Sequence, residues 1–169
     1  MGFSEKQRQI LRFPYSPYEA LICDGAVRSG KTSVMSLSFL LWAMGAFSGC
    51  AFAICGKSVG RAERNIIAPL LSVRYLQENF DLRYNRGEHV LTVRRGGTEN
   101  RFYLFGGKDG SSYTLIQGVT LAGVLLDEVA LMPRSFVEQA LARCSVEGAR
   151  FWFNCNPENP MHWPSTLCL

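Results

Sequence analysis

Residues 25–32, GAVRSGKT, match the pattern GxxxxGK[ST] at every fixed position. A short apolar run at residues 19–23 precedes it, and a long apolar run with helical spacing follows at residues 32–46. Between a strand and a helix, such a loop points successive backbone N–H groups and the helix N-terminus at phosphate oxygens. The sequence therefore predicts a nucleoside-triphosphate-binding loop (P-loop) near the start of an α/β domain.

The loop residues have distinct expected roles. Gly25 and Gly30 let the backbone curl, Lys31 adds a positive charge at the β- and γ-phosphates, and the hydroxyl of Thr32 serves Mg²⁺. The set expected to bind nucleotide also includes two serines, Ser29 and Ser33. The alternative, a chance glycine loop with a surface lysine, is disfavoured by the flanking strand and helix.

Two adjacent carboxylates supply the second half of the expected chemistry. The apolar run at residues 119–126 predicts a buried strand that ends in Asp127 and Glu128. Asp127 is expected to hold Mg²⁺, and Glu128 to orient and deprotonate the water that attacks the γ-phosphate. Alone, such a strand end is more often a boundary with a solvated loop. Downstream of a P-loop it favours nucleotide hydrolysis.

The other periodic segments complete an α/β pattern. Residues 50–55 and 151–154 indicate strands, and residues 90–93 and 102–105 indicate a hairpin around a Gly-containing turn. Residues 59–76 have helical spacing, with a break or kink expected near Pro69, and a further helix is expected to begin at Pro133. The sum predicts a three-layer sandwich with a mainly parallel sheet, as in P-loop nucleoside triphosphatases.

Composition narrows the class of protein. With 169 residues, 47% apolar and 19% charged, the chain has the balance of one ordinary domain. The N-terminus lacks the apolar core of a secretory signal, and the longest apolar stretch, residues 37–47, is too short to span a bilayer, so we expect a cytosolic protein. The six cysteines form no CxxC pair and are expected to be reduced packing thiols. His89 and His162 are assigned no chemistry.

Charge is unevenly distributed. The net charge is +4, yet residues 57–108 alone hold ten Lys or Arg against five Asp or Glu. A surface that meets nucleic-acid phosphates and an ordinary solvated basic face explain this excess equally well.

Several segments in order resemble one known family. GAVRSGKT, SYTLIQG, AGVLLDEVALMP, RSFVEQALARCS and FNCNPENPMHW are similar to the ordered motifs of phage large terminase subunits, particularly the group that includes defective-prophage terminases, over residues 4–163. The resemblance implies an ATPase that uses ATP and Mg²⁺ to thread double-stranded DNA through a portal into a preformed capsid. It implies as partners a portal protein, a small terminase subunit and further copies of the chain in a ring, in the host cytoplasm and without a membrane.

The resemblance also assigns roles to single residues. Arg28 corresponds to a basic residue near the γ-phosphate, and Asn156, or else Asn154, to the family's coupling motif. Gln7 resembles the glutamine that reads adenine in related motors. The competing interpretations are a solvent-facing loop arginine for Arg28, a simple turn for the segment with Asn154 and Asn156, and an exposed helix residue for Gln7. Three aromatic residues lie between Gln7 and the loop, namely Phe13, Tyr15 and Tyr18. One of them is expected to stack on the base, and most of them to pack in the core.

Members of the family continue into a nuclease domain, and residues 164–169 do not resemble their continuation. We therefore expect residues 1–169 to form one P-loop ATPase domain, incomplete at its C-terminus and without a nuclease domain. Two alternatives stay open. One is a helicase-like nucleic-acid translocase, and the other is a non-catalytic remnant of a terminase that still binds nucleotide.

Overall fold

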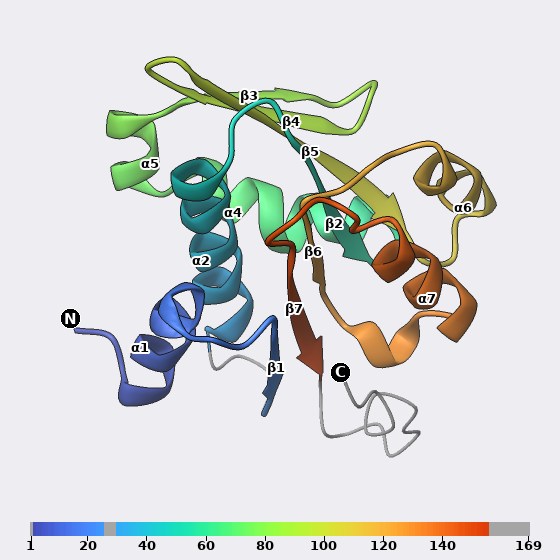
Figure 1. Cartoon of the computed structure of the whole chain (residues 1–169), viewed down its shortest axis with the longest axis horizontal. Coiled ribbons are helices and arrows are strands. Elements are labelled where there is room, and N and C mark those ends of the chain that lie inside the picture. The colour runs from blue at the N-terminus through green and yellow to red at the C-terminus, as the bar shows by residue number, and fades with distance from the viewer. Residues whose placement is uncertain (1, 26–29, 156–169) are drawn as a thin grey trace.

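A computed structural model describes residues 2–25 and 30–155, and residues 1, 26–29 and 156–169 lie outside the described part. Within that part, one sheet has the strand order β1-β7-β6-β2-β5-β4-β3 (Figure 1). The strands are β1 (Ala20–Asp24), β2 (Ala51–Gly56), β3 (Asp81–Asn85), β4 (Val90–Arg95), β5 (Thr98–Gly106), β6 (Gly123–Leu126) and β7 (Arg150–Cys155). β1, β7, β6, β2 and β5 run parallel, whereas β3 and β4 extend the sheet in antiparallel fashion.

Helices cover both faces of this sheet. They are α1 (Glu5–Arg12), α2 (Lys31–Ala46), α3 (Val59–Ala62), α4 (Ala68–Leu71), α5 (Arg74–Asn79), α6 (Gly110–Gln117) and α7 (Arg134–Ala142). α1 to α5 pack in one apolar cluster and α6 and α7 in a second, on opposite faces of the central strands (Figure 1). The expected three-layer α/β arrangement with a mainly parallel sheet is therefore confirmed.

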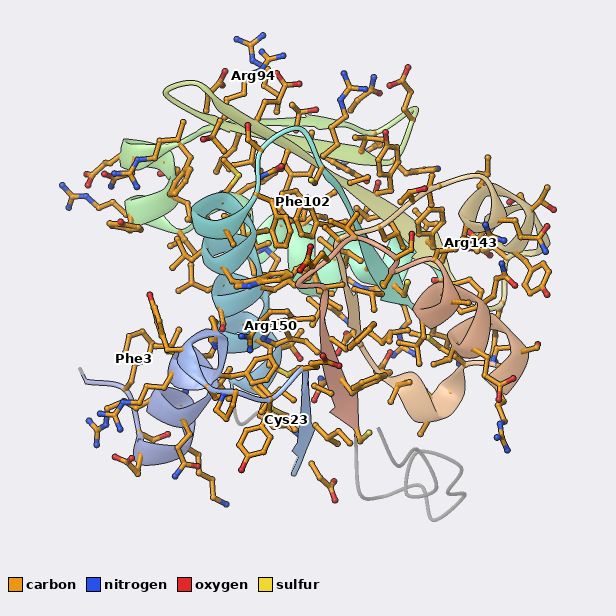
Figure 2. The ribbon with its side chains drawn as sticks, viewed as in Figure 1. Phe3, Cys23, Arg94, Phe102, Arg143 and Arg150 are labelled. Atoms are coloured by element: carbon orange, nitrogen blue, oxygen red, sulfur yellow. The ribbon has the colours of Figure 1, made fainter. Side chains whose placement is uncertain are left out.

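Aromatic side chains fill the layer beneath α2. Phe39 packs edge-on against Trp152 of β7, with ring centroids 5.1 Å apart, and against Phe102 of β5 at 5.8 Å. Figure 2 shows Phe102 between α2 and the sheet. Because these rings fix α2 to the strands, the helix N-terminus is held at one edge of the sheet.

Most predicted elements occur where expected. The hairpin is confirmed, with Leu91 opposite Phe102 in the β4–β5 ladder. Residues 59–76, expected to be helical with a break near Pro69, form several short helical segments. A π-helical turn (Glu63–Ile67) leads into α4, Pro69 lies in the first turn of α4, and the break follows at Ser72 and Val73. Proline is tolerated in a first turn because its missing N–H has no partner there.

Two expectations are wrong. The strand expected from Val119 begins only at Gly123, because the preceding residues lead away from α6 and Leu121 N donates to the carbonyl of Arg143 at 2.8 Å. Core packing holds for Phe13, which is buried, but Tyr15 and Tyr18 are 90% and 70% exposed. Both tyrosines lie in the connection that runs over the surface from α1 to β1.

Five cysteines of the described part are free thiols, as expected, and Cys168 lies outside that part. Burial raises the pKa of Cys23 to about 11 and that of Cys144 to about 12, and it raises the pKa of Cys55 further. These thiols are therefore protonated near neutral pH. None of the helices within residues 2–25 and 30–155 combines the length and the apolar character that a membrane span requires.

Candidate nucleotide-binding site

Three neighbouring parallel strands bring the predicted residues to one edge of the sheet. β7 lies between β1 and β6, with Cys23 opposite Asn154 and Leu126 opposite Phe153. The residues that follow each strand therefore meet at the carboxyl edge, where open α/β sheets bind their ligands. The P-loop begins after β1, and Asp127 follows β6.

Lys31 opens α2 directly after the loop. Gly30 precedes it in the left-handed region, with φ 71°, a conformation that favours glycine. The Lys31 ammonium donates to the carbonyl oxygens of Gly25 and, at 3.2 Å, of Cys155. Uncharged carbonyls hold the ammonium at the N-terminus of α2, and a phosphate is a stronger acceptor for it than either of them.

A buried polar cluster lies next to Lys31. The amide nitrogen of Asn154 donates to the Asp127 carboxylate at 2.6 Å and to the Thr32 hydroxyl at 3.0 Å. The Thr32 hydroxyl lies 3.5 Å from the same Asp127 oxygen. Asp127 is 4% and Asn154 8% exposed, so β6, β7 and α2 fix all three groups.

This cluster has the donor set of a magnesium site. A carboxylate and a hydroxyl are oxygen ligands of the kind that Mg²⁺ takes beside substrate phosphates. The amide oxygen of Asn154 is buried and finds no hydrogen-bond partner among the described residues. Buried polar atoms without a partner are rare and call for a missing water, ion or ligand. The residues present therefore fit Mg²⁺, and Thr32 and Asp127 are the two that could hold it.

Glu128 has an unusual backbone and an unexpected neighbour. Its φ of 54° and ψ of 44° lie in the left-handed region, which non-glycine residues seldom adopt. Its carboxylate oxygen Oε2 lies 3.6 Å from Nε of Arg61 on α3. Arg61 was not predicted. Its contact requires β2 and β6 to be neighbours, and one sequence contains no signal of that strand order.

Gln7 lies close to the P-loop. A side-chain carbon added to Gly30 would be only 3.2 Å from Nε2 of Gln7. Gln7 also completes a capping box, since its Oε1 accepts from Ser4 N and its own N–H donates to the Ser4 hydroxyl. One side of its amide is thus engaged in α1, and the other side is directed at the loop.

Arg150 fixes the segment between α1 and β1. Its guanidinium donates to the carbonyl oxygens of Tyr18 at 2.6 Å and of Ser16 at 3.1 Å. Figure 2 shows Arg150 between β7 and this connection. The contacts anchor α1, and with it Gln7, beside the P-loop.

Some expected site residues fall elsewhere. Arg28, Ser29 and Asn156 lie outside the described residues. Ser33 is exposed on the first turn of α2, and its carbonyl accepts from the Ser36 hydroxyl. A separate cavity of about 950 Å³ lies between the outer face of β3–β5 and α6, and none of the predicted residues lines it.

The chain is similar to solved phage proteins. It matches the large terminase of a thermophilic bacteriophage with 50% identity and a TM-score of 0.87, over 93% of this chain and 40% of that one. The large terminase of the same phage in complex with ATP-gamma-S matches at 46% identity and a TM-score of 0.82, over 92% of this chain and 38% of that one. The chain thus spans about two fifths of these relatives.

A more distant match concerns the fold alone. The large terminase ATPase domain of Thermus phage P74-26 aligns with 96% of this chain and 67% of its own, at 21% identity and a TM-score of 0.75. The terminase of the thermophilic phage and the ATPase domain of phage P74-26 both agree with the P-loop α/β architecture described above. No protein-family model and no curated protein matches the chain.

Proposed function

The chain belongs to the phage large terminase family, and we propose that it is the ATP-hydrolysing motor part of such a terminase, which drives double-stranded DNA into a procapsid. One observation carries the proposal. Thr32, Asp127 and Asn154 form a buried cluster beside Lys31, at the carboxyl edge of the sheet. A relative of 46% identity is known in complex with ATP-gamma-S, which supports ATP as the nucleotide.

Lys31 and the loop bind the triphosphate. The Lys31 ammonium leaves the carbonyls of Gly25 and Cys155 and pairs with the β- and γ-phosphates, while the N-terminus of α2 adds its backbone N–H groups. Arg28 is proposed to contact the γ-phosphate, and Ser29 and Ser33 to complete the loop's polar contacts. Gln7 is proposed to read the adenine with the amide nitrogen that faces Gly30.

Thr32 and Asp127 would hold Mg²⁺, which would supply positive charge beside the phosphates. Asn154 keeps these two ligands apart at a fixed spacing, because its amide donates to both. Glu128 accepts the proton of the attacking water, as a carboxylate directly after the metal ligand is suited to do. For this step its carboxylate must leave Arg61, from which it is 3.6 Å away.

Asn154 is also the group best suited to report hydrolysis. It lies on β7, one residue before Cys155, whose carbonyl accepts from Lys31. A change at the phosphates therefore alters the contacts that Lys31 and Asn154 make at the end of β7. We propose Asn154 as a coupling residue, and Asn156 as its companion.

The family supplies the remaining proposals. The portal protein, the small terminase subunit and further copies of the chain in a ring are the proposed partners, in the cytoplasm of the host. Domain organisation is proposed likewise, with residues 1–169 as one P-loop ATPase domain.

The test compares ATP turnover of the chain alone, with linear duplex DNA, and with DNA plus procapsids that carry a portal. If the chain is a packaging motor, its ATP turnover should rise with DNA and rise again with portal-bearing procapsids. Stimulation by single-stranded DNA without any procapsid effect would point to a helicase-like translocase. ATP binding without turnover under all conditions would identify a non-catalytic remnant.

A further inference from the structure

Several arginines of the basic segment, residues 57–108, are paired with carboxylates of the same segment. Arg74 pairs with Glu78 at 2.6 Å, Arg83 with Asp81 at 3.2 Å, and Arg94 with Glu99 at 2.7 Å. Figure 2 shows Arg94 at the outer edge of the β3–β5 extension. These arginines therefore contribute little net charge to the surface.

Two lysines of the same segment are not neutralised. Lys57 follows β2 and Lys108 follows β5, and neither ammonium has a carboxylate within 4.0 Å in the part of the chain described. The nearest acid in sequence, Asp109, is engaged elsewhere, since its carboxylate accepts from Val59 N at 3.3 Å. Two lysines without an ion pair among the described residues thus lie at the carboxyl edge of the sheet.

The backbone holds the two lysines together. β2 and β5 are in register with Gly56 opposite Gly106, and Lys108 N donates to the Lys57 carbonyl at 3.1 Å. A side-chain carbon on Gly106 would come within 2.0 Å of the Asp109 carboxylate, so only glycine permits this approach. The like charge of Lys108 lowers the pKa of Lys57, in agreement with two ammonium groups that face each other.

We propose that Lys57 and Lys108, together with Arg61, bind a phosphate of the duplex DNA backbone at a site separate from the P-loop. This inference rests on the proposed function, because it supplies that motor with a contact to its DNA. A backbone phosphate offers anionic oxygens to several cations at once and relieves the repulsion between the two lysines. Both side chains reach solvent, since Lys108 is exposed and Lys57 half-buried.

The strand order argues against the bound nucleotide as occupant. β7 and β6 separate β1, which carries the P-loop, from β2 and β5. At about 4.8 Å per strand, Lys57 follows a strand roughly 14 Å from β1, and Lys108 one roughly 19 Å away. The lysines therefore lie beside the nucleotide site, on the far side of Glu128.

Arg61 connects the two sites. It lies on α3, shortly after Lys57, with its backbone N–H donating to the Ser58 hydroxyl at 3.2 Å, and its guanidinium contacts Glu128. A phosphate bound at Lys57 and Lys108 competes with Glu128 for Arg61. DNA binding thereby frees the carboxylate that hydrolysis requires, and turnover becomes DNA-dependent.

The experiment measures binding of a fluorescent 30-base-pair duplex to the nucleotide-free chain over a range of salt concentrations. The test variant is Lys57→Gln/Lys108→Gln, and the control Arg74→Gln/Arg134→Gln removes the same charge from exposed helix pairs. The slope of log affinity against log salt should become shallower by about 1 in the test variant only, as the loss of one phosphate contact implies. Affinity at 0.1 M salt should fall roughly tenfold or more.

Titration of MgATP into the same proteins separates the possible outcomes. Equal ATP affinity in parent and test variant, with DNA binding weakened only in the latter, supports the DNA site. Unchanged DNA binding in the test variant overturns it, as does a parent that binds ATP but no DNA. A matching loss of ATP affinity would assign the lysines to the nucleotide and also overturns it. If the parent binds no ATP, the proposed function fails, and the salt slope still decides the lysine site.

Discussion

Asn154 donates to the Asp127 carboxylate at 2.6 Å and so joins the end of β7 to the end of β6 inside a buried cluster. The same amide reaches Thr32 at the start of α2. Three elements that are distant in sequence are therefore coupled through one neutral side chain. Because an amide does not titrate, the donor of this link is the same at any working pH.

Replacement of that amide should loosen the cluster. Asn154→Ala leaves the buried Asp127 carboxylate without its shortest hydrogen bond, so the free energy of unfolding should fall by about 1–3 kcal/mol. Urea titration at pH 7 without nucleotide measures this loss. Gln9→Ala, an amide exposed on α1, is the control and should change little. Equal stability of Asn154→Ala and the parent would show that the cluster does not order this edge.

Glu128→Gln should retain nucleotide binding and lose hydrolysis. Removal of a general base typically costs about 10²–10⁴-fold in rate, whereas the loss of one charge outside the phosphate contacts leaves affinity nearly unchanged. Single-turnover hydrolysis of radiolabelled ATP measures the rate. Glu138→Gln on the surface of α7 is the control. A rate in Glu128→Gln equal to that of an active parent would reject Glu128 as the base.

Alkaline pH should destabilise the protein partly through Cys23. Burial raises the pKa of this thiol from 9.0 to about 11, so the folded state keeps a proton that the unfolded state loses. The stabilising effect is complete below pH 9 and is lost as the pH rises through 11. A two-unit difference corresponds to about 2–3 kcal/mol.

Urea titrations at pH 8, 9, 10 and 11 test this prediction. Cys23→Ala should show a shallower loss of stability above pH 9 than the parent does. Cys50→Ala changes a less buried thiol and should follow the parent. Parallel pH profiles for Cys23→Ala and the parent would mean that Cys23 does not contribute to the alkaline transition.

The chemical groups of the site were predictable, because Lys31, Thr32, Asp127 and Glu128 occur in local patterns with local mechanisms. Their mutual positions were not predictable, since Thr32 meets Asp127 only through the strand order of the sheet. The contact of Arg61 with Glu128 was not predictable either, because it also depends on the strand order. A local pattern identifies what a residue can do, whereas its partner depends on which strands become neighbours.

Some elements were missed for reasons of local chemistry. β3 alternates Leu82 and Tyr84 inward, but its Asp, Arg and Asn residues are poor strand formers and masked the pattern. α6 begins with Gly110 and two serines, which disfavour helix, and is held instead by packing of Ile116. In β6, an apolar run did not distinguish the strand from the buried connection before Gly123.

Nucleotide phosphates should bind where the Lys31 ammonium now contacts the carbonyls of Gly25 and Cys155. Calorimetric titration of ATP, at fixed Mg²⁺ and salt, into the parent and Lys31→Ala measures this binding. Arg134→Ala on α7 serves as the control. We expect the parent and the control to bind alike and Lys31→Ala to bind roughly 10- to 100-fold more weakly, as the loss of a charged hydrogen bond implies. Equal affinity of Lys31→Ala and the parent, or a parent that binds no ATP, would contradict the account.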